Sequence, residues 1–230
     1  NKKIKKQKQK ELELKRIETL QREKQLHQLK RKRIVTRERG RRQHPSSQVV
    51  FWCKGQEKDS VFEDWSVFTG VVKSGDKKGQ PKRLVRLNQN SACLLTAREP
   101  DIQEKDRRIL GLYMVKEFFV GRLCQDGFIP AHPEYRVQLS REESERFPFW
   151  KYYVNERYPH KMTWNTGKYR YFDNLWLAQI LRDVVSVKEG TEGHKSTERF
   201  FEYFCLMNGI KAETLPEPNG GLVRNNLLAD

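Results

Sequence analysis

Long hydrophobic runs and cysteines are scarce in this chain of 230 residues. No stretch approaches the ~18 consecutive apolar residues that a helix needs to cross a bilayer. No apolar segment followed by a small-residue cleavage site lies near the start. The four cysteines have no C-x-x-C spacing, which argues against a disulfide scaffold and against a structural zinc site. We therefore expect no membrane partner and an intracellular, cytoplasmic protein, nuclear if the source is a eukaryote.

The common enzyme signatures are also missing. The chain has no phosphate-binding G-x-x-x-x-G-K loop, no G-x-G-x-x-G and no G-x-S-x-G. We assign no catalytic residue, no metal ligand and no cofactor, and we expect a binding protein rather than an enzyme. A metal-dependent nuclease stays open as an alternative, because Glu63 or Asp64 could supply a carboxylate ligand. The sequence fixes no partner for either residue.

Positive charge is present in excess, and it is concentrated at one end. Residues 1–44 hold 18 of the 46 basic residues, five of the 30 acidic residues and no Asp, which gives +13 of the net charge of +16. The rest of the chain is therefore almost neutral. A basic patch of this kind indicates a polyanionic partner for the first segment rather than a basic surface over the whole body.

Residues 1–44 form what we call the arm. The arm lacks Pro and is rich in Lys, Glu, Gln, Arg and Leu, which predicts a long exposed helix that ends near Gly40. Its cations can neutralise phosphates without reading bases. The alternatives are a helical spacer or stalk that contacts a partner or a second copy through residues 1–40, and a localisation signal. The arm residues that we predict to contact nucleic acid are Lys30, Arg31, Lys32, Arg33, Arg37, Arg39, Arg41 and Arg42.

Residues 45–210 are predicted to form one globular domain in which strands come first and helices later. Candidate strands are Val49–Cys53, Val61–Phe68, Leu84–Leu87, Ala92–Thr96, Arg108–Phe119, Gly127–Ala131 and Glu134–Leu139. Ser140 and Asp173 are candidate helix N-caps, and Asn174–Ser186 and Lys195–Met207 are candidate helices. This order predicts an α+β fold with a mostly antiparallel, barrel-like sheet and C-terminal helices. Residues 211–230 are predicted to be a frayed tail.

Two features of the body suggest a binding surface. The turn-rich loop Lys73–Arg83 is basic, and the basic residues predicted to grip a phosphate backbone are Lys73, Lys77, Lys78, Lys82, Arg83 and Arg98, with Arg86 close by. Trp52, Trp65 and Trp150 are candidates for stacking on bases. The alternatives are a solvated hairpin tip for the loop and core packing for the tryptophans.

Three segments carry a resemblance to a known family. Ala92–Thr96, Arg108–Val115 with Gly111, and Phe128–Leu139 resemble the middle of PUA-like domains, including the EVE and ASCH groups, over about residues 90–140. The resemblance implies a small twisted β-barrel with flanking helices that binds RNA or modified bases in DNA. The Gly-Asp that usually precedes the first of these strands is replaced by Gln89-Asn90-Ser91. No pocket residue is carried over.

Together these observations predict a nucleic-acid-associated binding module. The arm would grip phosphates of DNA or RNA, and the β-rich body would recognise a base. An assembly or partner-binding domain with a helical stalk is the main alternative.

Overall fold

The computed structural model describes residues 46–227, together with residues 9, 13, 16, 17, 19–21, 24, 25 and 28. These ten earlier positions are helical and exposed. The remainder of the helix that we predict for the arm lies outside the described residues. The chain divides into two compact units, Asn1–Arg41 and Arg42–Asp230. The second unit, called the body below, contains all the elements named in this section.

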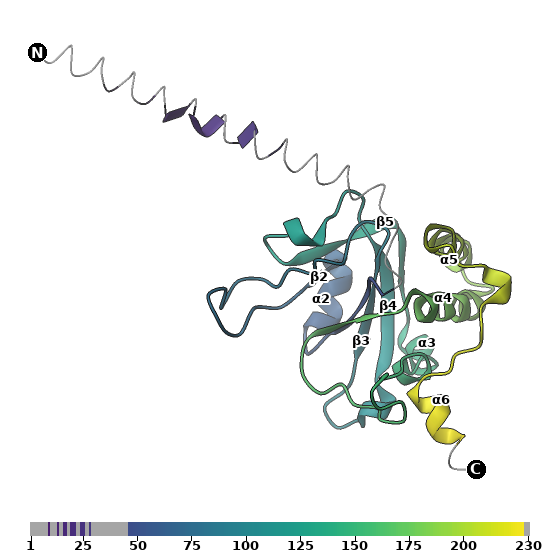
Figure 1. The fold of residues 1–230 in the computed structure, drawn as a ribbon. Coiled ribbons are helices and arrows are strands. Elements are labelled where there is room, and N and C mark those ends of the chain that lie inside the picture. The colour runs from purple at the N-terminus through teal and green to yellow at the C-terminus, as the bar shows by residue number, and fades with distance from the viewer. Residues whose placement is uncertain are drawn as a thin grey trace, which may run out of the picture. The chain divides into compact units, whose positions relative to one another are not determined.

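The body is built on a six-stranded, curled sheet (Figure 1). Its strands are β1 (Gln48–Trp52), β2 (Ser66–Phe68), β3 (Ala92–Ala97), β4 (Arg108–Val115), β5 (Phe128–Gln138) and β6 (Tyr169–Phe172), in the order β2-β5-β4-β3-β1-β6. The β1–β3 pair is parallel and the other pairs are antiparallel. The predicted α+β class with a mostly antiparallel, barrel-like sheet and C-terminal helices is confirmed.

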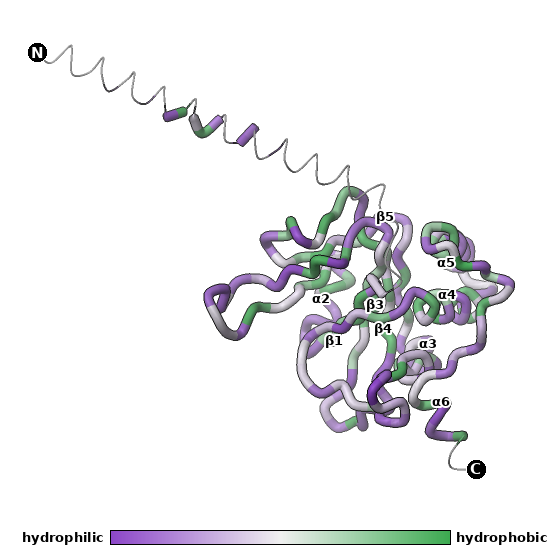
Figure 2. The backbone as a smooth tube through the Cα atoms, viewed as in Figure 1, coloured by the Kyte–Doolittle hydropathy of each residue, from purple (hydrophilic) through white to green (hydrophobic). Residues whose placement is uncertain are grey.

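The two faces of the sheet have separate cores because side chains alternate along each strand. The helices α3 (Arg141–Glu145), α4 (Asn174–Lys188) and α5 (His194–Asn208) lie on one face, where Val50 packs with Leu181 and Phe204. The helix α2 (Glu57–Asp64) and the loop between β2 and β3 lie on the other face, where Val49 and Phe51 are buried. Hydrophobic residues line the strands, whereas the tip of that loop is hydrophilic (Figure 2).

The predicted N-caps Ser140 and Asp173 are confirmed, and both predicted C-terminal helices are present with ends that differ by at most two residues. The Ser140 hydroxyl accepts a hydrogen bond from the backbone N–H of Glu143, and the Glu143 carboxylate accepts one from Ser140 N, which makes a capping box for α3. Asp173 caps α4, and Gly209 ends α5 in the left-handed conformation. The described part of the body also contains the 3-10 turns Glu104–Asp106, Gly121–Leu123, Phe149–Lys151 and Ala212–Thr214 and the helix α6 (Gly221–Asn226).

Two strand predictions are wrong. The segment Val61–Phe68 is not one strand, because α2 extends to Asp64, Trp65 turns the chain with φ 47°, and only Ser66–Phe68 pairs with β5. Leu84–Leu87 is a turn, closed by the hydrogen bond from Leu87 N to Leu84 O. Leu84 and Leu87 are both buried. They are apolar because each side chain packs into the core from a turn, and not because the segment alternates as a strand does.

Other differences concern continuity. The two strands predicted over residues 127–139 are the single strand β5, and β6 was not predicted. Residues 211–227 include the 3-10 turn Ala212–Thr214 and α6, and Leu215 packs into the helix-side core. Among the described residues, no helix is both long enough and apolar enough to span a membrane.

Gly111 in β4 is required by close packing. A Cβ atom at this position would lie 2.6 Å from the Val137 carbonyl oxygen and 2.9 Å from the Phe62 ring. The sheet register also shifts beside it, between Leu95 and Thr96. The missing side chain therefore lets α2 approach the sheet through Phe62.

Gly111→Ala is expected to lower the free energy of unfolding by about 1–3 kcal/mol, because the added methyl overpacks this contact. Urea denaturation measures the change. Gly193→Ala is the matched control, since φ is −76° there and the nearest atoms to an added Cβ lie 3.8 Å away. Equal stability of the two variants would contradict the packing role of Gly111.

A buried arginine joins the loop before β4 to the helix-side core. Arg107 is fully buried, and its guanidinium lies 4.3 Å from the Trp52 ring centroid and 4.4 Å from that of Trp164. It makes two hydrogen bonds to the Glu104 carboxylate, at 2.5 and 2.8 Å. Burial lowers the pKa of Arg107, and Glu104 opposes this effect. The arginine is thus held between two rings and one carboxylate.

Candidate nucleic-acid interface

The loop that connects β2 to β3 is an ordered hairpin. Lys82 N donates to Gly70 O at 2.8 Å, Val72 N donates to Gln80 O at 2.9 Å, and the Thr69 hydroxyl donates to Lys82 O at 2.7 Å. These bonds fix the base of the loop, and the loop projects from the body beside β2 (Figure 1). The loop therefore holds its cations out from the sheet, and those exposed at its tip and on its return are Lys73, Lys77, Lys78 and Arg83.

Two tyrosines of the edge strand β6 lie next to the returning part of this loop. Tyr169 and Tyr171 alternate along β6 and therefore share the face opposite α4 and α5. Lys82 Nζ lies 5.7 Å from the Tyr169 ring centroid, and the Arg86 guanidinium lies 4.0 Å from that of Tyr171. Partial burial raises the pKa of both phenols. The rings are thus neutral over the physiological pH range and keep their faces next to cations.

A second pair of rings lies on β2 and β5. The centroids of Phe68 and Phe128 are 5.1 Å apart, and Phe128 is 50% exposed. Lys168 Nζ lies 5.4 Å from the Phe68 ring and forms an ion pair with Glu57. The Lys168 stem packs beside Gly70, where an added Cβ would lie 3.5 Å from Lys168 Cδ. Lys168 therefore connects the phenylalanine pair to the base of the loop.

These contacts form two groups of rings and cations that meet at Gly70, beside which Lys168 packs and whose carbonyl oxygen accepts from Lys82 N. We name the two groups together the basic aromatic track. It consists of Phe128, Phe68, Lys168, Lys82, Tyr169, Tyr171 and Arg86. Rings and cations succeed each other along it, and the exposed cations of the loop flank it. The acidic groups beside it include Glu57, which is paired with Lys168, Asp126, which accepts a hydrogen bond from Phe128 N, and Asp76 at the loop tip. The track thus offers stacking surface and net positive charge together, as single-stranded nucleic acid requires.

A cleft of about 400 Å³ adjoins the track. Arg86 and Tyr171 belong both to the track and to the lining of this cleft. Its lining also includes Tyr153, Asn155, Glu156, Arg157, Asp173 and Trp176. We call it the tyrosine cleft.

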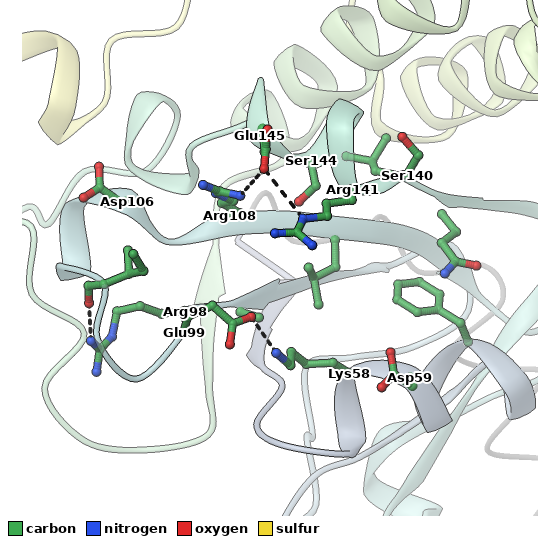
Figure 3. A pocket seen from close by; sticks show the side chains of 16 residues that line it. Lys58, Asp59, Arg98, Glu99, Asp106, Arg108, Ser140, Arg141, Ser144 and Glu145 are labelled. Carbon is green, nitrogen blue, oxygen red and sulfur yellow. Dashed lines mark hydrogen bonds and ion pairs between the residues drawn. The ribbon is translucent and has the colours of Figure 1, made fainter.

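A larger cleft of about 640 Å³ lies between α2 and α3 and has balanced charges (Figure 3). Lys58 pairs with Glu99 at 2.6 Å, and Arg108 and Arg141 both pair with Glu145, at 3.0 and 3.9 Å. Its cations already have carboxylate partners. This charge-balanced cleft is therefore less suited to a polyanion than the track is.

The tryptophans predicted to stack on bases lie elsewhere. Trp150 is fully buried, and its indole N–H donates to Glu104 at 3.3 Å, which favours a packing role. Trp52 has Lys54 Nζ 3.7 Å and the Arg107 guanidinium 4.3 Å from its ring centroid. Trp65 is in edge contact with Phe62 and Tyr113, and the Arg136 guanidinium lies 4.7 Å from its ring. The three side chains are not brought together.

The predicted basic residues fall into three groups. The structure brings Lys73, Lys77, Lys78, Lys82 and Arg83 together on the loop. Arg98 lies apart from them, because it pairs with Glu104 at 3.3 Å and donates to the Ile102 carbonyl oxygen. The arm cations Lys30, Arg31, Lys32, Arg33, Arg37, Arg39, Arg41 and Arg42 lie outside the described residues.

Sequence reasoning missed Lys168, Tyr169 and Tyr171. The available signal was the short Tyr-Arg-Tyr-Phe segment after Gly167, which alternates as a strand does. Metal ligands were not predicted, and across residues 46–227 and the ten helical positions of the arm no group of three or more His, Cys, Asp or Glu could hold a metal ion.

Comparisons with protein-family models, with curated proteins and with solved structures find no match to this chain. The resemblance to PUA-like domains therefore stays a prediction.

Proposed function

We propose that this chain is a nucleic-acid-binding module whose body holds a single strand along the basic aromatic track. It acts inside the cell, in the cytoplasm or, in a eukaryote, in the nucleus. The arm adds affinity that does not depend on base sequence, because its cations contact phosphates alone.

The observation that carries the proposal is the succession of rings and cations from Phe128 to Arg86. Every base has a π-face, so rings bind bases of any sequence, while lysine and arginine follow the phosphates. A single strand suits this surface better than a duplex does, because the bases of a duplex already stack on each other. The hydrogen-bonded base of the loop keeps the cations in place before binding, which limits the entropy lost on association.

Fluorescence anisotropy with labelled single-stranded RNA and DNA tests the proposal. The triple variant Lys82→Gln, Arg86→Gln and Lys168→Gln is expected to bind at least about tenfold more weakly in 0.1 M salt, because three phosphate contacts are lost. The matched control is Lys58→Gln, Arg108→Gln and Arg141→Gln, which removes the same charge from the charge-balanced cleft and also breaks ion pairs.

The control triple variant is expected to bind within about twofold of the unchanged chain at the same salt concentration, since its distant charges are screened. An equal loss of affinity in both triple variants would show that binding depends only on net charge. It would contradict the role of the basic aromatic track. Absence of binding by the unchanged chain at low salt would overturn the function itself. Light scattering of the full chain separates this function from the stalk alternative, which predicts oligomers without nucleic acid.

A further inference from the structure

The tyrosine cleft combines aromatic walls with hydrogen-bond acceptors. Tyr171 comes from β6, Trp176 from the first turn of α4, and Tyr153 from the segment after the 3-10 turn Phe149–Lys151. The Tyr153 and Trp176 rings are in edge contact, with centroids 5.3 Å apart. A volume of about 400 Å³ falls within the range of roughly 300–1,000 Å³ that is typical of small-ligand pockets. The cleft is therefore large enough for a nucleobase. It adjoins the track, because Arg86 and Tyr171 belong to both.

Asp173 is the best-positioned acceptor of this cleft. Its Oδ1 atom accepts the capping hydrogen bond from Leu175 N at 2.8 Å, which fixes the side chain at the start of α4. Within the part of the chain that the structure describes, its Oδ2 atom has no hydrogen-bond partner. A carboxylate has about four lone-pair sites, so both oxygens keep acceptor capacity. Asp173 thus presents a fixed pair of acceptors among aromatic side chains.

The other polar groups of the cleft complement this carboxylate. Asn155 Oδ1 is used locally, because it accepts from Arg157 N at 3.1 Å. Glu156 is exposed and adds a second negative charge, whereas Arg86 and Arg157 add two positive charges. The cations suit the phosphates on either side of a bound base, and the carboxylates suit a base edge that donates hydrogen bonds.

We propose that the tyrosine cleft takes a guanine base of the bound strand, with the Asp173 carboxylate on its Watson–Crick edge. This proposal rests on the proposed function. Guanine presents two adjacent donors there, N1–H and the N2 amino group, which match two carboxylate oxygens. Adenine and cytosine each present an amino donor beside an acceptor nitrogen, and uracil presents one N–H between two carbonyls, so each of them places an acceptor against the carboxylate. Hydrogen bonds to an ionised acceptor are stronger than those between neutral groups, and two parallel bonds add geometric selectivity.

The test uses the full chain and uridine octamers that carry one central G, A or C, together with the corresponding thymidine octamers as DNA. The guanine octamer is expected to bind about tenfold more tightly than the adenine and cytosine octamers, which is the discrimination of one good bidentate contact. Asp173→Asn is expected to abolish this preference. Asn caps helices as well as Asp does, so the melting temperature of the variant should stay close to that of the unchanged chain.

For the adenine and cytosine octamers, the expected effect of Asp173→Asn is the opposite. Because Asp173→Asn removes a negative charge beside the phosphates, its affinity for the adenine and cytosine octamers should be equal or slightly higher. Asp76→Asn is the matched control, since it makes the same change at the exposed loop tip outside the cleft. This control is expected to keep the guanine preference.

The outcomes separate this proposal from the function beneath it. Salt-dependent binding of all octamers with no base preference would overturn the guanine site and leave the nucleic-acid-binding function standing. A guanine preference that survives Asp173→Asn would also overturn the assignment. Failure of every octamer to bind at low salt would overturn the proposed function.

Discussion

Replacing the eight cations of the arm from Lys30 to Arg42 by glutamine is expected to weaken binding to nucleic acid by about a hundredfold or more in 0.1 M salt. Each cation that contacts a phosphate releases a condensed counterion. The negative slope of log K against log salt concentration should therefore become less steep, by as much as about 6 for a single strand. The loss should be nearly uniform across base sequences, because phosphate contacts carry no sequence information. Anisotropy titrations between 50 and 300 mM salt measure both quantities.

The proposed guanine preference provides the internal control for this experiment. If the arm supplies affinity and the body supplies selectivity, the arm variant should lose affinity and keep its ratio between octamers. Affinity that stays unchanged and flat with salt would contradict a role of the arm in binding, and it would favour the helical spacer.

Arg107→Met is expected to lower the free energy of unfolding by about 2–3 kcal/mol, because the Glu104 carboxylate loses its two hydrogen bonds from a fully buried guanidinium and keeps the ion pair with the partly exposed Arg98. It also removes the guanidinium from between Trp52 and Trp164, so two cation–ring contacts are lost. Urea denaturation followed by tryptophan fluorescence measures the total change in stability, since Trp52 and Trp164 are two of the five tryptophans.

Two variants make this prediction specific. Arg141→Met changes an arginine whose side chain is 87% exposed and is expected to alter stability by less than about 0.5 kcal/mol. The double variant Glu104→Gln with Arg107→Met should be more stable than Arg107→Met alone, because it removes the carboxylate that has lost its buried partner, while the amide oxygen can still accept from Trp150. If the double variant is no more stable than Arg107→Met, the loss of stability comes from packing alone.

The sequence predicts the architecture of the body well where local patterns decide it. Val49 to Phe51 and Ala92 to Thr96 are apolar runs of strand-forming residues, and both are strands. Asp173 and Gly209 act as the helix start and stop that their residue types favour. The strand prediction around Phe62 failed because aromatic residues favour strands on average, while here the local sequence from Glu57 to Asp64 is mostly polar and forms a helix that packs on the sheet through Val61 and Phe62.

The candidate site was less predictable because it depends on contacts between distant residues. The loop cations are visible as a basic turn-rich stretch, but nothing local indicates that β6 pairs with β1 and brings Tyr171 to Arg86, 85 positions away. The tryptophans show the converse problem. Trp150 and Trp52 are residues of the type that stacks on bases. In the structure, however, Trp150 is buried, and Lys54 and Arg107 lie over the ring of Trp52.

The parallel pairing of β1 with β3 has a consequence for how this surface can vary. Two neighbouring parallel strands require a return crossover, and the chain between Trp52 and Ala92 provides it with α2, β2 and the projecting hairpin. Insertions or deletions at the hairpin tip leave the strand ladder intact, and doubling a flexible loop costs only about 0.6 kcal/mol. Hairpin length can therefore change with no change to the core, and under the proposed function a longer hairpin would cover more nucleotides.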